Sequence, residues 1–469
     1  MTFLSSTVIQ MITKLSAKEE ITMADGQWQS GPYKPVDQEI EEFDLEVTGS
    51  IPPELNGMLM RIGPNPIPPT AEGHNFFEGD GMVHALTLSN GEAKAYKNRW
   101  VRTEEVSRKL SETPIADHID EQDTSNTHVF PFADKLFALT EGCIPYRLDM
   151  SLNTIMRDTF NGDIAQGFSA HPHIDPATGR LHAIGYDVSA DAAATHFVIE
   201  PDGTLGWKTK IPLGGPSFIH DFAMTENFAI IWDMPLQFRQ ELKDAGDSAP
   251  FKWDHDYPTR VGIRPLNAKT PDIQWFETRS CFAFHSVNAW EVYDDQGALS
   301  EIICDVIQFP KMFDEDRSGP GDAIPQLYRW VFNMKTGQMS NEIFDPRIQE
   351  FPRIDDRYWG KPSNFAVTTE LFNSTGGSGI IVRDPNGDTT SYGFEENVVA
   401  SEGVFVPQSE TAGEGEGWIM TFAVNKNTGA SKASVFDATQ VSNGPMGEVI
   451  FPQRVPFTFH GSWIPEAVL

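Results

Sequence analysis

The amino-acid sequence predicts an all-β fold, either a β-propeller or a large barrel, on three observations. Turn signals that end in Gly, most of them opened by Asp, Asn or Pro, recur along the chain, as expected of β-hairpin tips. Short strand-like runs lie between them, and long helical periodicity is scarce. No Pro- or Ser-rich linker separates the hairpins, which favours one closed structure over several sandwiches. The turn signals are residues 89–91, 175–179, 200–203, 294–297, 334–337, 384–387 and 425–429.

Representative strands are expected at residues 136–140, 180–186 and 228–232, which are apolar or alternate in polarity. Helices are expected only at residues 104–110 and 235–245, as excursions between strands. No crisp repeat is visible, so the number of blades does not follow from this pattern.

We expect residues 1–35 to form a loose N-terminal leader and residues 36–469 to form one domain. The first 22 residues lack the basic start and long apolar centre of a secretory signal, and Met23 could serve as a second start. No apolar run reaches the roughly 18 residues of a membrane-spanning helix.

The chain carries a formal charge of -32, from 35 Lys and Arg against 67 Asp and Glu. This charge argues against nucleic acid, whose binding depends on Lys and Arg releasing counterions. It also disfavours purely electrostatic docking on anionic lipid, but not apolar contact with a membrane. Cys143, Cys281 and Cys304 are far apart and form no CxxC pair, so neither a disulfide framework nor a zinc ribbon is indicated. We therefore expect a cytoplasmic protein, with peripheral membrane contact through an apolar rim.

Four histidines stand in similar settings, each after an aromatic or small apolar residue of a strand-like run. They are His171, His220, His285 and His460. A buried imidazole needs a specific partner. For any one of them alone, a core histidine bonded to a backbone carbonyl is the simpler interpretation. As a set they suit a metal site on a propeller axis, and four neutral imidazoles suit Fe, Zn, Cu or Ni.

Such a site also predicts carboxylates that accept the other ring N–H of the histidines and fix their tautomer. Glu141, Glu350 and Glu402 each adjoin an apolar run, where an unpaired charge is unfavourable. For any one of them alone, a solvated strand end is the simpler interpretation.

The residues resemble the carotenoid cleavage oxygenase family over nearly the whole chain. The matching segments include Arg61-Ile62-Gly63-Pro64-Asn65-Pro66, Phe77-Glu78-Gly79-Asp80-Gly81-Met82, Ala170-His171-Pro172, His220-Asp221-Phe222, Phe284-His285, Glu350-Phe351-Pro352-Arg353-Ile354 and Phe459-His460-Gly461-Ser462-Trp463. One such motif would be weak, but the ordered set is specific.

The resemblance implies a seven-bladed β-propeller over residues 36–469, with helices and loops capping an iron site on the axis. It implies that His171, His220, His285 and His460 hold one Fe(II), and that Glu141, Glu350 and Glu402 support them by hydrogen bonds. The neighbouring His173 and His84 are not ligands in the family. The implied reaction uses O2 to cleave a carbon–carbon double bond of an apolar conjugated substrate into two carbonyl products.

The resemblance leaves two substrate classes open, carotenoids or apocarotenoids and stilbene-type phenolics. Stilbene cleavers usually carry Tyr and Lys where this chain has Trp100 and Thr140, which favours a polyene. Thr140 matches a residue whose methyl group partly screens an open iron position in some members. Gly403 replaces a common Pro, which would loosen Glu402. The residues expected to line the substrate site are Phe76, Phe77, Trp100, Phe282 and Phe284.

Two alternatives stay open. One is cleavage of a stilbene or phenylpropanoid through different phenol contacts. The other is a propeller that binds or isomerises a polyene without cleaving it. The completeness of the histidine and glutamate set favours a dioxygenase.

Overall fold

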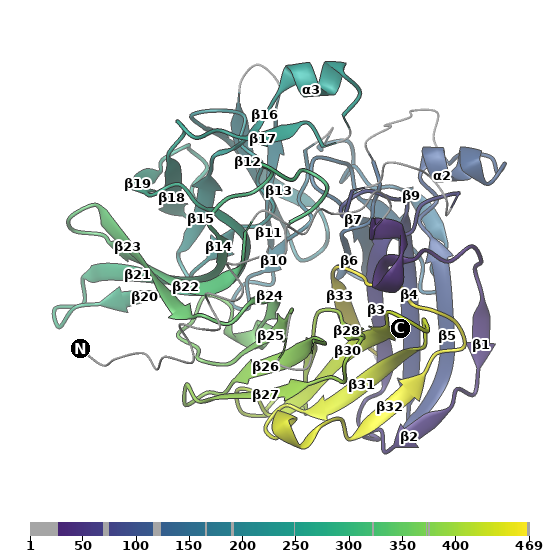
Figure 1. Cartoon of the computed structure of the whole chain (residues 1–469). Helices are drawn as coiled ribbons and strands as arrows, with labels where there is room; N and C mark the ends of the chain where they lie inside the picture. Colours follow the sequence, from purple (N-terminus) through teal and green to yellow (C-terminus); the bar gives the residue numbers. More distant parts are fainter. Residues whose placement is uncertain are drawn as a thin grey trace.

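In the computed structural model, seven antiparallel sheets of four to six strands each are arranged as the blades of a propeller, and a two-stranded sheet stands apart from them (Figure 1). The structure describes residues 27–466, except 69–74, 116–122, 165–166, 189–191, 248, 321–322, 372 and 374–375. The predicted all-β propeller is therefore confirmed, and the number of blades is seven.

Each blade has four to six strands, and most blades are continuous in sequence. The strands are β1 (Glu41–Phe43), β3 (Gly57–Pro64), β4 (Gly81–Ser89), β5 (Glu92–Trp100) and β33 (Gly461–Pro465) in the first blade; β6 (His128–Phe132), β7 (Lys135–Leu139), β8 (Tyr146–Leu148) and β9 (Thr154–Arg157) in the second; β10 (His173–Ile174), β11 (Leu181–Asp187), β12 (Ala193–Ile199) and β13 (Leu205–Pro212) in the third; β14 (Ala223–Met224), β15 (Phe228–Asp233), β18 (Thr259–Pro265) and β19 (Gln274–Thr278) in the fourth; β20 (Phe282–Tyr293), β21 (Leu299–Phe309), β22 (Gln326–Asn333) and β23 (Gln338–Asp345) in the fifth; β24 (Gln349–Arg353), β25 (Ala366–Glu370), β26 (Gly379–Arg383) and β27 (Thr389–Gly393) in the sixth; and β2 (Val47–Gly49), β28 (Val398–Ala400), β29 (Val404–Pro407), β30 (Gly417–Asn425), β31 (Ser431–Asp437) and β32 (Gly447–Ile450) in the seventh.

Both ends of the chain close the ring. The C-terminal strand β33 pairs with β3 of the first blade, and the N-terminal strand β2 pairs with β32 of the last blade. Each pairing satisfies backbone groups that would otherwise stand on an open sheet edge. The closure ties sequence-distant segments together, which is how residues from both ends of the chain reach one axial site.

The hairpin tips lie where the sequence predicts them. All seven turn signals connect consecutive antiparallel strands, such as β4 to β5 at Gly91 and β26 to β27 at Gly387. Gly91 has φ 77° and Gly387 has φ 90°, a region that glycine adopts without strain. The three representative strand predictions correspond to β7, β11 and β15.

The helices agree only in part with the prediction. Helix α2 (Glu104–Lys109) forms where expected, because the Thr103 hydroxyl accepts a hydrogen bond from the Val106 N–H and caps its first turn. The second predicted helix is too long: residues 236–238 form strand β16 (Leu236–Phe238), and only α3 (Gln240–Asp244) is helical. Strand β16 pairs with β17 (Phe251–Trp253) in a separate hairpin, so tertiary pairing overrides the local helical pattern.

The remaining short helices lie in the loops. They are the 3-10 helices η1 (Gln27–Gln29), η2 (Gly31–Tyr33), η3 (Asp356–Tyr358) and η4 (Val441–Asn443). None of the helices in the described part of the chain has the length and apolar character needed to cross a membrane. Cys143, Cys281 and Cys304 are buried free thiols.

The predicted leader is described only from residue 27 onward. There Trp28 and Tyr33 pack their rings against Phe76, with centroid distances of 4.9 and 5.8 Å. Residues 1–26 lie outside the described part, so a loose leader remains a prediction for them.

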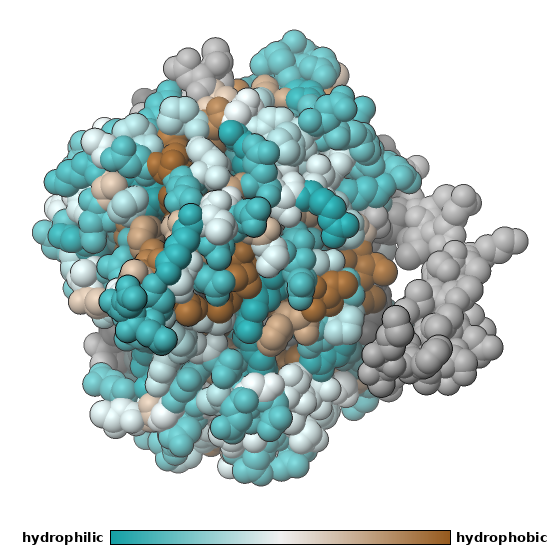
Figure 2. Space-filling model, turned by 90° about the vertical axis from the view of Figure 1, so that its left-hand side faces the viewer, coloured by the Kyte–Doolittle hydropathy of each residue, from teal (hydrophilic) through white to brown (hydrophobic). Residues whose placement is uncertain are grey.

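The surface is largely hydrophilic on the face shown in Figure 2, with hydrophobic side chains gathered in a band across it. Strand β23 lies on the side of the molecule that this view faces (Figure 1), and its Ile343 and Phe344 are exposed.

Candidate active site

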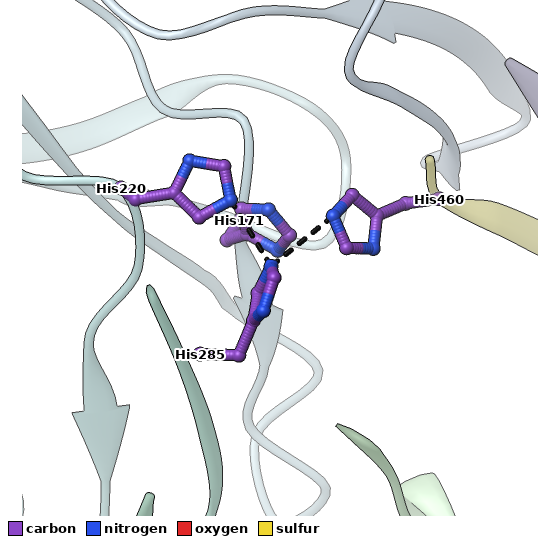
Figure 3. Close-up of side chains that lie close together, drawn as sticks. All are labelled: His171, His220, His285 and His460. Carbon is purple, nitrogen blue, oxygen red and sulfur yellow. Dashed lines mark hydrogen bonds between the residues drawn. The ribbon is translucent and has the colours of Figure 1, made fainter. Parts of the chain in front are cut away.

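Four histidines from four different blades meet in one buried cluster (Figure 3). His171 and His220 come shortly before β10 and β14, His285 lies in β20, and His460 directly precedes β33. Their ligand atoms lie within 4.8 Å of one another. The structure thus brings together the four histidines that the sequence analysis selected.

The imidazole rings point their Nε2 atoms toward one another. The Nε2 atoms of His220 and His285 are 3.0 Å apart, and those of His285 and His460 are 3.2 Å apart. The buried Nε2 atom of His171 has no hydrogen-bond partner among the described residues. The cluster therefore presents several nitrogen atoms to one small volume.

Three glutamates hold the opposite nitrogen atoms of three of these rings. Nδ1 of His220 contacts Glu141, Nδ1 of His285 is 2.6 Å from Glu350, and Nδ1 of His460 is 2.9 Å from Glu402. Because a carboxylate accepts a hydrogen bond, this arrangement favours a proton on Nδ1 and a lone pair on Nε2. Lone pairs that converge at about 3 Å repel one another unless a cation lies between them. The donor set therefore fits a metal ion.

Burial and mutual proximity shape the protonation of these histidines. Burial, together with the neighbouring histidines, lowers the pKa of His171 well below its usual value. Burial lowers the pKa of His460 to about 3, although Glu402 opposes this shift. Burial also acts to lower the pKa of His285, but Glu350, together with Asp221 and Glu402, outweighs it and the pKa is raised. A cation at the centre would compete with protons for the same nitrogen atoms.

Glu402 is held more firmly than the sequence suggested. Its Oε2 atom lies 3.5 Å from Arg61 Nη1 and 3.4 Å from Arg353 Nη1, and it accepts the Gly461 N–H at 3.1 Å. Burial would raise the pKa of Glu402, but Arg353, His460 and Arg61 outweigh it and hold the pKa well below its usual range. The expected loosening by Gly403 is therefore not seen.

Thr140 lies beside Glu141 in the cavity wall. Its Oγ1 atom is 3.0 Å from Oγ1 of Thr127, which also approaches Glu141 Oε2 at 3.4 Å. The idea that the Thr140 methyl group screens an open metal position stays a prediction.

A buried carboxylate behind the cluster ties three of the histidine-bearing segments together. Asp221 accepts hydrogen bonds from the His173 ring at 2.9 Å, from Ser286 N–H at 2.7 Å and from the Ser286 hydroxyl at 2.8 Å. His173 is two residues from His171, Asp221 follows His220 and Ser286 follows His285. This partnership also keeps His173 outside the four-histidine cluster, as expected.

Sequence reasoning missed several supporting residues. Arg61, Arg353 and Asp221 stand in segments that were matched to the family, but nothing in their local sequence indicates which distant group they contact. His128 was also missed, although its ring lies 5.5 Å from the rings of both His171 and His460. Its Nδ1 atom is 3.0 Å from the Ala170 carbonyl, next to His171.

A cavity of about 1770 Å³ opens onto the histidine cluster and includes His220, His285 and His460 in its wall. Next to the histidines its wall contains the rings of Phe284 and Phe351 together with Glu141 and Glu350. Of the five residues expected to line a substrate site, Phe76, Phe77 and Phe284 do so.

Trp100 and Phe282 do not line the cavity, contrary to expectation. Trp100 donates its indole N–H to the Asn65 carbonyl at 2.8 Å and packs with Met82 and Val106 in a separate apolar cluster. Phe282 is fully buried and packs edge-on against Phe284, which lies at the cavity surface. Both are core residues: Trp100 packs in its own apolar cluster, and Phe282 lies behind the ring of Phe284.

Comparison with known proteins identifies the family. The family model described as retinal pigment epithelial membrane protein matches residues 33–465. The chain belongs to this family. Among curated members, the chain is 32% identical to the carotenoid cleavage oxygenase of Mycobacterium tuberculosis, with 95% of this chain and 100% of that protein covered. It is 31% identical to the carotenoid 9,10(9',10')-cleavage dioxygenase 1 of Pisum sativum, with 94% and 90% covered.

Solved structures of other members have the same fold. Lignostilbene dioxygenase from Pseudomonas brassicacearum superposes with a TM-score of 0.84 at 27% identity, covering 93% of this chain and 98% of that chain. The cobalt-substituted Synechocystis enzyme ACO superposes with a TM-score of 0.83 at 25% identity, covering 92% and 98%. The resemblance found in the sequence is confirmed, and the named relatives in this carotenoid cleavage oxygenase family are oxygenases.

Proposed function

We propose that this protein is an Fe(II)-dependent dioxygenase that cleaves a carbon–carbon double bond of a carotenoid or apocarotenoid with O2 to give two carbonyl products. The observation that carries the proposal is the convergence of histidine Nε2 atoms whose Nδ1 atoms face glutamates. His171, His220, His285 and His460 would hold the ion. When bound, Fe(II) supplies the capacity to activate O2.

The protein's own part is to orient the rings and to stabilise a cation. Glu141, Glu350 and Glu402 keep three rings in one tautomer and one orientation. Arg61 and Arg353 compensate the charge of Glu402. No arginine or lysine among the described residues pairs with Glu141 or Glu350, so their negative charge favours a cation among the four neutral imidazoles.

The aromatic cavity supports an apolar conjugated substrate. Phe77 stacks against Phe284 at a centroid distance of 5.7 Å and contacts Phe313 at the same distance. Phe284 also packs edge-on against His220 at 5.0 Å, so the aromatic wall continues to the histidine cluster. Such a wall would place one double bond beside the ion and would exclude water from it.

A stilbene or phenylpropanoid is the second candidate, because relatives include lignostilbene dioxygenase and an isoeugenol monooxygenase at 28% identity. Trp100 is buried outside the cavity and therefore does not distinguish between the two substrate classes. Thr140 does line the cavity and has no ammonium group with which to bind a phenolate. The two curated relatives described above are named for carotenoid cleavage, which favours the polyene.

We also propose that substrate reaches the cavity from a membrane surface. Ile324 lies in the cavity wall and is 51% exposed, and Pro320 and Pro325 also line this wall.

The test is anaerobic reconstitution with Fe(II), followed by exposure to air with an apocarotenal. Loss of polyene absorbance and two carbonyl fragments that together contain both atoms of O2 are expected. His285→Ala should abolish iron binding and cleavage, whereas the exposed His255→Ala should retain both. Recovery of a rearranged substrate of unchanged mass would overturn cleavage in favour of isomerisation, and full activity of His285→Ala would overturn the ligand assignment.

A further inference from the structure

Two tyrosines in the cavity wall have hydroxyl groups without a hydrogen-bond partner among the described residues. They are Tyr33 and Tyr186. Tyr96 and Tyr146 are buried away from the cavity, and their hydroxyls form hydrogen bonds with His84 and Glu104, respectively. Tyr33 and Tyr186 are only partly buried and both line the cavity, so their hydroxyls are available to a ligand there.

Tyr186 stands on the His220 side of the cluster. Its ring contacts Phe218 at 5.8 Å, and Phe218 stacks on His220 at 6.2 Å. Phe251 closes the same group and lies 5.0 Å from Phe218. One phenylalanine therefore separates Tyr186 from a histidine of the cluster.

Tyr33 stands on the side of His285 and His460. Its ring contacts Phe457 at 5.7 Å, and Phe457 contacts Phe351 at 5.6 Å. The ring of Phe351 then lies 5.4 Å from His460 and 5.8 Å from His285. The two tyrosines thus belong to different aromatic groups that reach the cluster from different histidines.

Both phenols stay neutral donors at physiological pH. Burial raises the pKa of Tyr33 to about 12. Burial raises the pKa of Tyr186 well above its usual value, and the nearby Glu141 carboxylate adds to the effect. A neutral O–H in an apolar cavity suits an uncharged hydroxyl or carbonyl oxygen, because burying an ion there would require a counter-charge.

We infer that Tyr186 and Tyr33 bind oxygen atoms at the two ends of a conjugated substrate whose apolar chain lies along the aromatic wall between them. This inference rests on the proposed function and narrows its substrate class to polyenes that carry a hydroxyl or carbonyl at each end. The same chemistry occurs in a shorter stilbene with a phenol at each end. Phe77 and Phe284 would contact the chain between the two ends.

The test compares a ring-hydroxylated apocarotenal with the same apocarotenal lacking the hydroxyl. Affinity is measured by ligand absorbance and fluorescence quenching with metal-free protein, and kcat/KM with the Fe(II)-loaded protein. The wild type should favour the hydroxylated compound by about 2- to 10-fold, the range expected for one hydrogen bond. One of the variants Tyr186→Phe and Tyr33→Phe should lose this preference. The other variant should lower the affinity for both compounds by a similar factor, because it loses the hydrogen bond to the aldehyde that both compounds carry.

Tyr96→Phe is the matched control, since it removes a hydroxyl that lies outside the cavity, and it should leave the preference intact. Unchanged affinities in both cavity variants would overturn the inference while leaving the proposed function standing. Tyrosine-dependent binding without cleavage would uphold the inference and overturn the dioxygenase. If only a stilbene with two phenols binds in a tyrosine-dependent way, the end-binding role stands and the polyene is the wrong occupant; if neither compound binds, the inference fails.

Discussion

Replacing Asp221 tests whether a single carboxylate behind the cluster positions three histidine-bearing segments. Asp221 is 3% exposed and accepts hydrogen bonds from Phe222 N–H at 2.7 Å as well as from Ser286 and His173. In Asp221→Asn, one carboxylate oxygen becomes an NH2 group. Whichever way the amide turns, at least one backbone N–H, of Phe222 or Ser286, then faces a donor.

The expected loss follows from this donor count. One buried unpaired N–H costs about 1–3 kcal/mol, so Asp221→Asn should lower the free energy of unfolding by about that amount. Asp221→Ala leaves both N–H groups unpaired and should cost about 2–6 kcal/mol. Since residues that support metal ligands typically change metal affinity about 10- to 100-fold, we expect the metal affinity of Asp221→Asn to fall about 10-fold.

Urea unfolding of the metal-free protein measures the first effect, and a chelator competition titration measures the second. Asp233→Asn is the matched control, because Asp233 is also fully buried and accepts hydrogen bonds from Gly214 N–H and Tyr257 at 2.9 and 2.7 Å. It should lower stability and leave metal affinity unchanged. Unchanged stability of Asp221→Asn would refute the expectation that a backbone N–H group of Phe222 or Ser286 becomes unpaired. A lowered stability with unaltered metal affinity would show that Asp221 holds the fold without positioning the histidines.

Three further outcomes are expected. Glu402→Gln should lower stability more than Glu141→Gln, because it leaves the buried Arg61 without its carboxylate and Arg353 with Asp356 at 3.8 Å as its remaining ion-pair partner among the described residues; both variants should weaken metal binding about 10- to 100-fold, and equal unfolding midpoints would contradict this charge argument. Burial lowers the pKa of His84 to about 3, so the unfolded chain binds a proton below pH 6.5 that the folded protein does not. Stability should therefore fall from pH 6.5 toward pH 3 by up to about 1.4 kcal/mol per pH unit from this residue, and His84→Gln should show a shallower slope in urea unfolding at fixed metal loading. Removal of metal with a chelator should lower Tm, and Fe(II) should restore it in a concentration-dependent way; an unchanged Tm at saturating Fe(II) would argue against binding to the folded state.

The residues that form each hairpin turn are contiguous in the sequence, which is why all seven hairpin tips could be predicted. Gly91 and Gly387 adopt positive φ within their own turns, so no distant contact is needed to place them. The second helix prediction failed for the opposite reason. Residues 236–238 pair with β17 some 15 positions later, and that pairing is invisible in a local pattern.

The histidines could be selected because each stands in an unusual local setting, an imidazole among aromatic and apolar residues. Their assembly could not be derived from spacing alone. The pairing of Arg61 with Glu402 spans 341 positions and depends on the ring being closed by β33. The resemblance to the family supplied what local physics could not, the number of blades and the partners of the histidines.

Sequence alone determined the all-β class, the hairpin tips and the residue types available for a metal site, because these depend on local backbone preference and side-chain chemistry. The tertiary structure decided which aromatic rings face the cavity. Trp100 was expected there and instead donates to Asn65 in the core, whereas Tyr186 was not expected and lies in the wall. The direction of a side chain from a strand depends on how its blade packs against its neighbours, and that is settled only when the propeller closes.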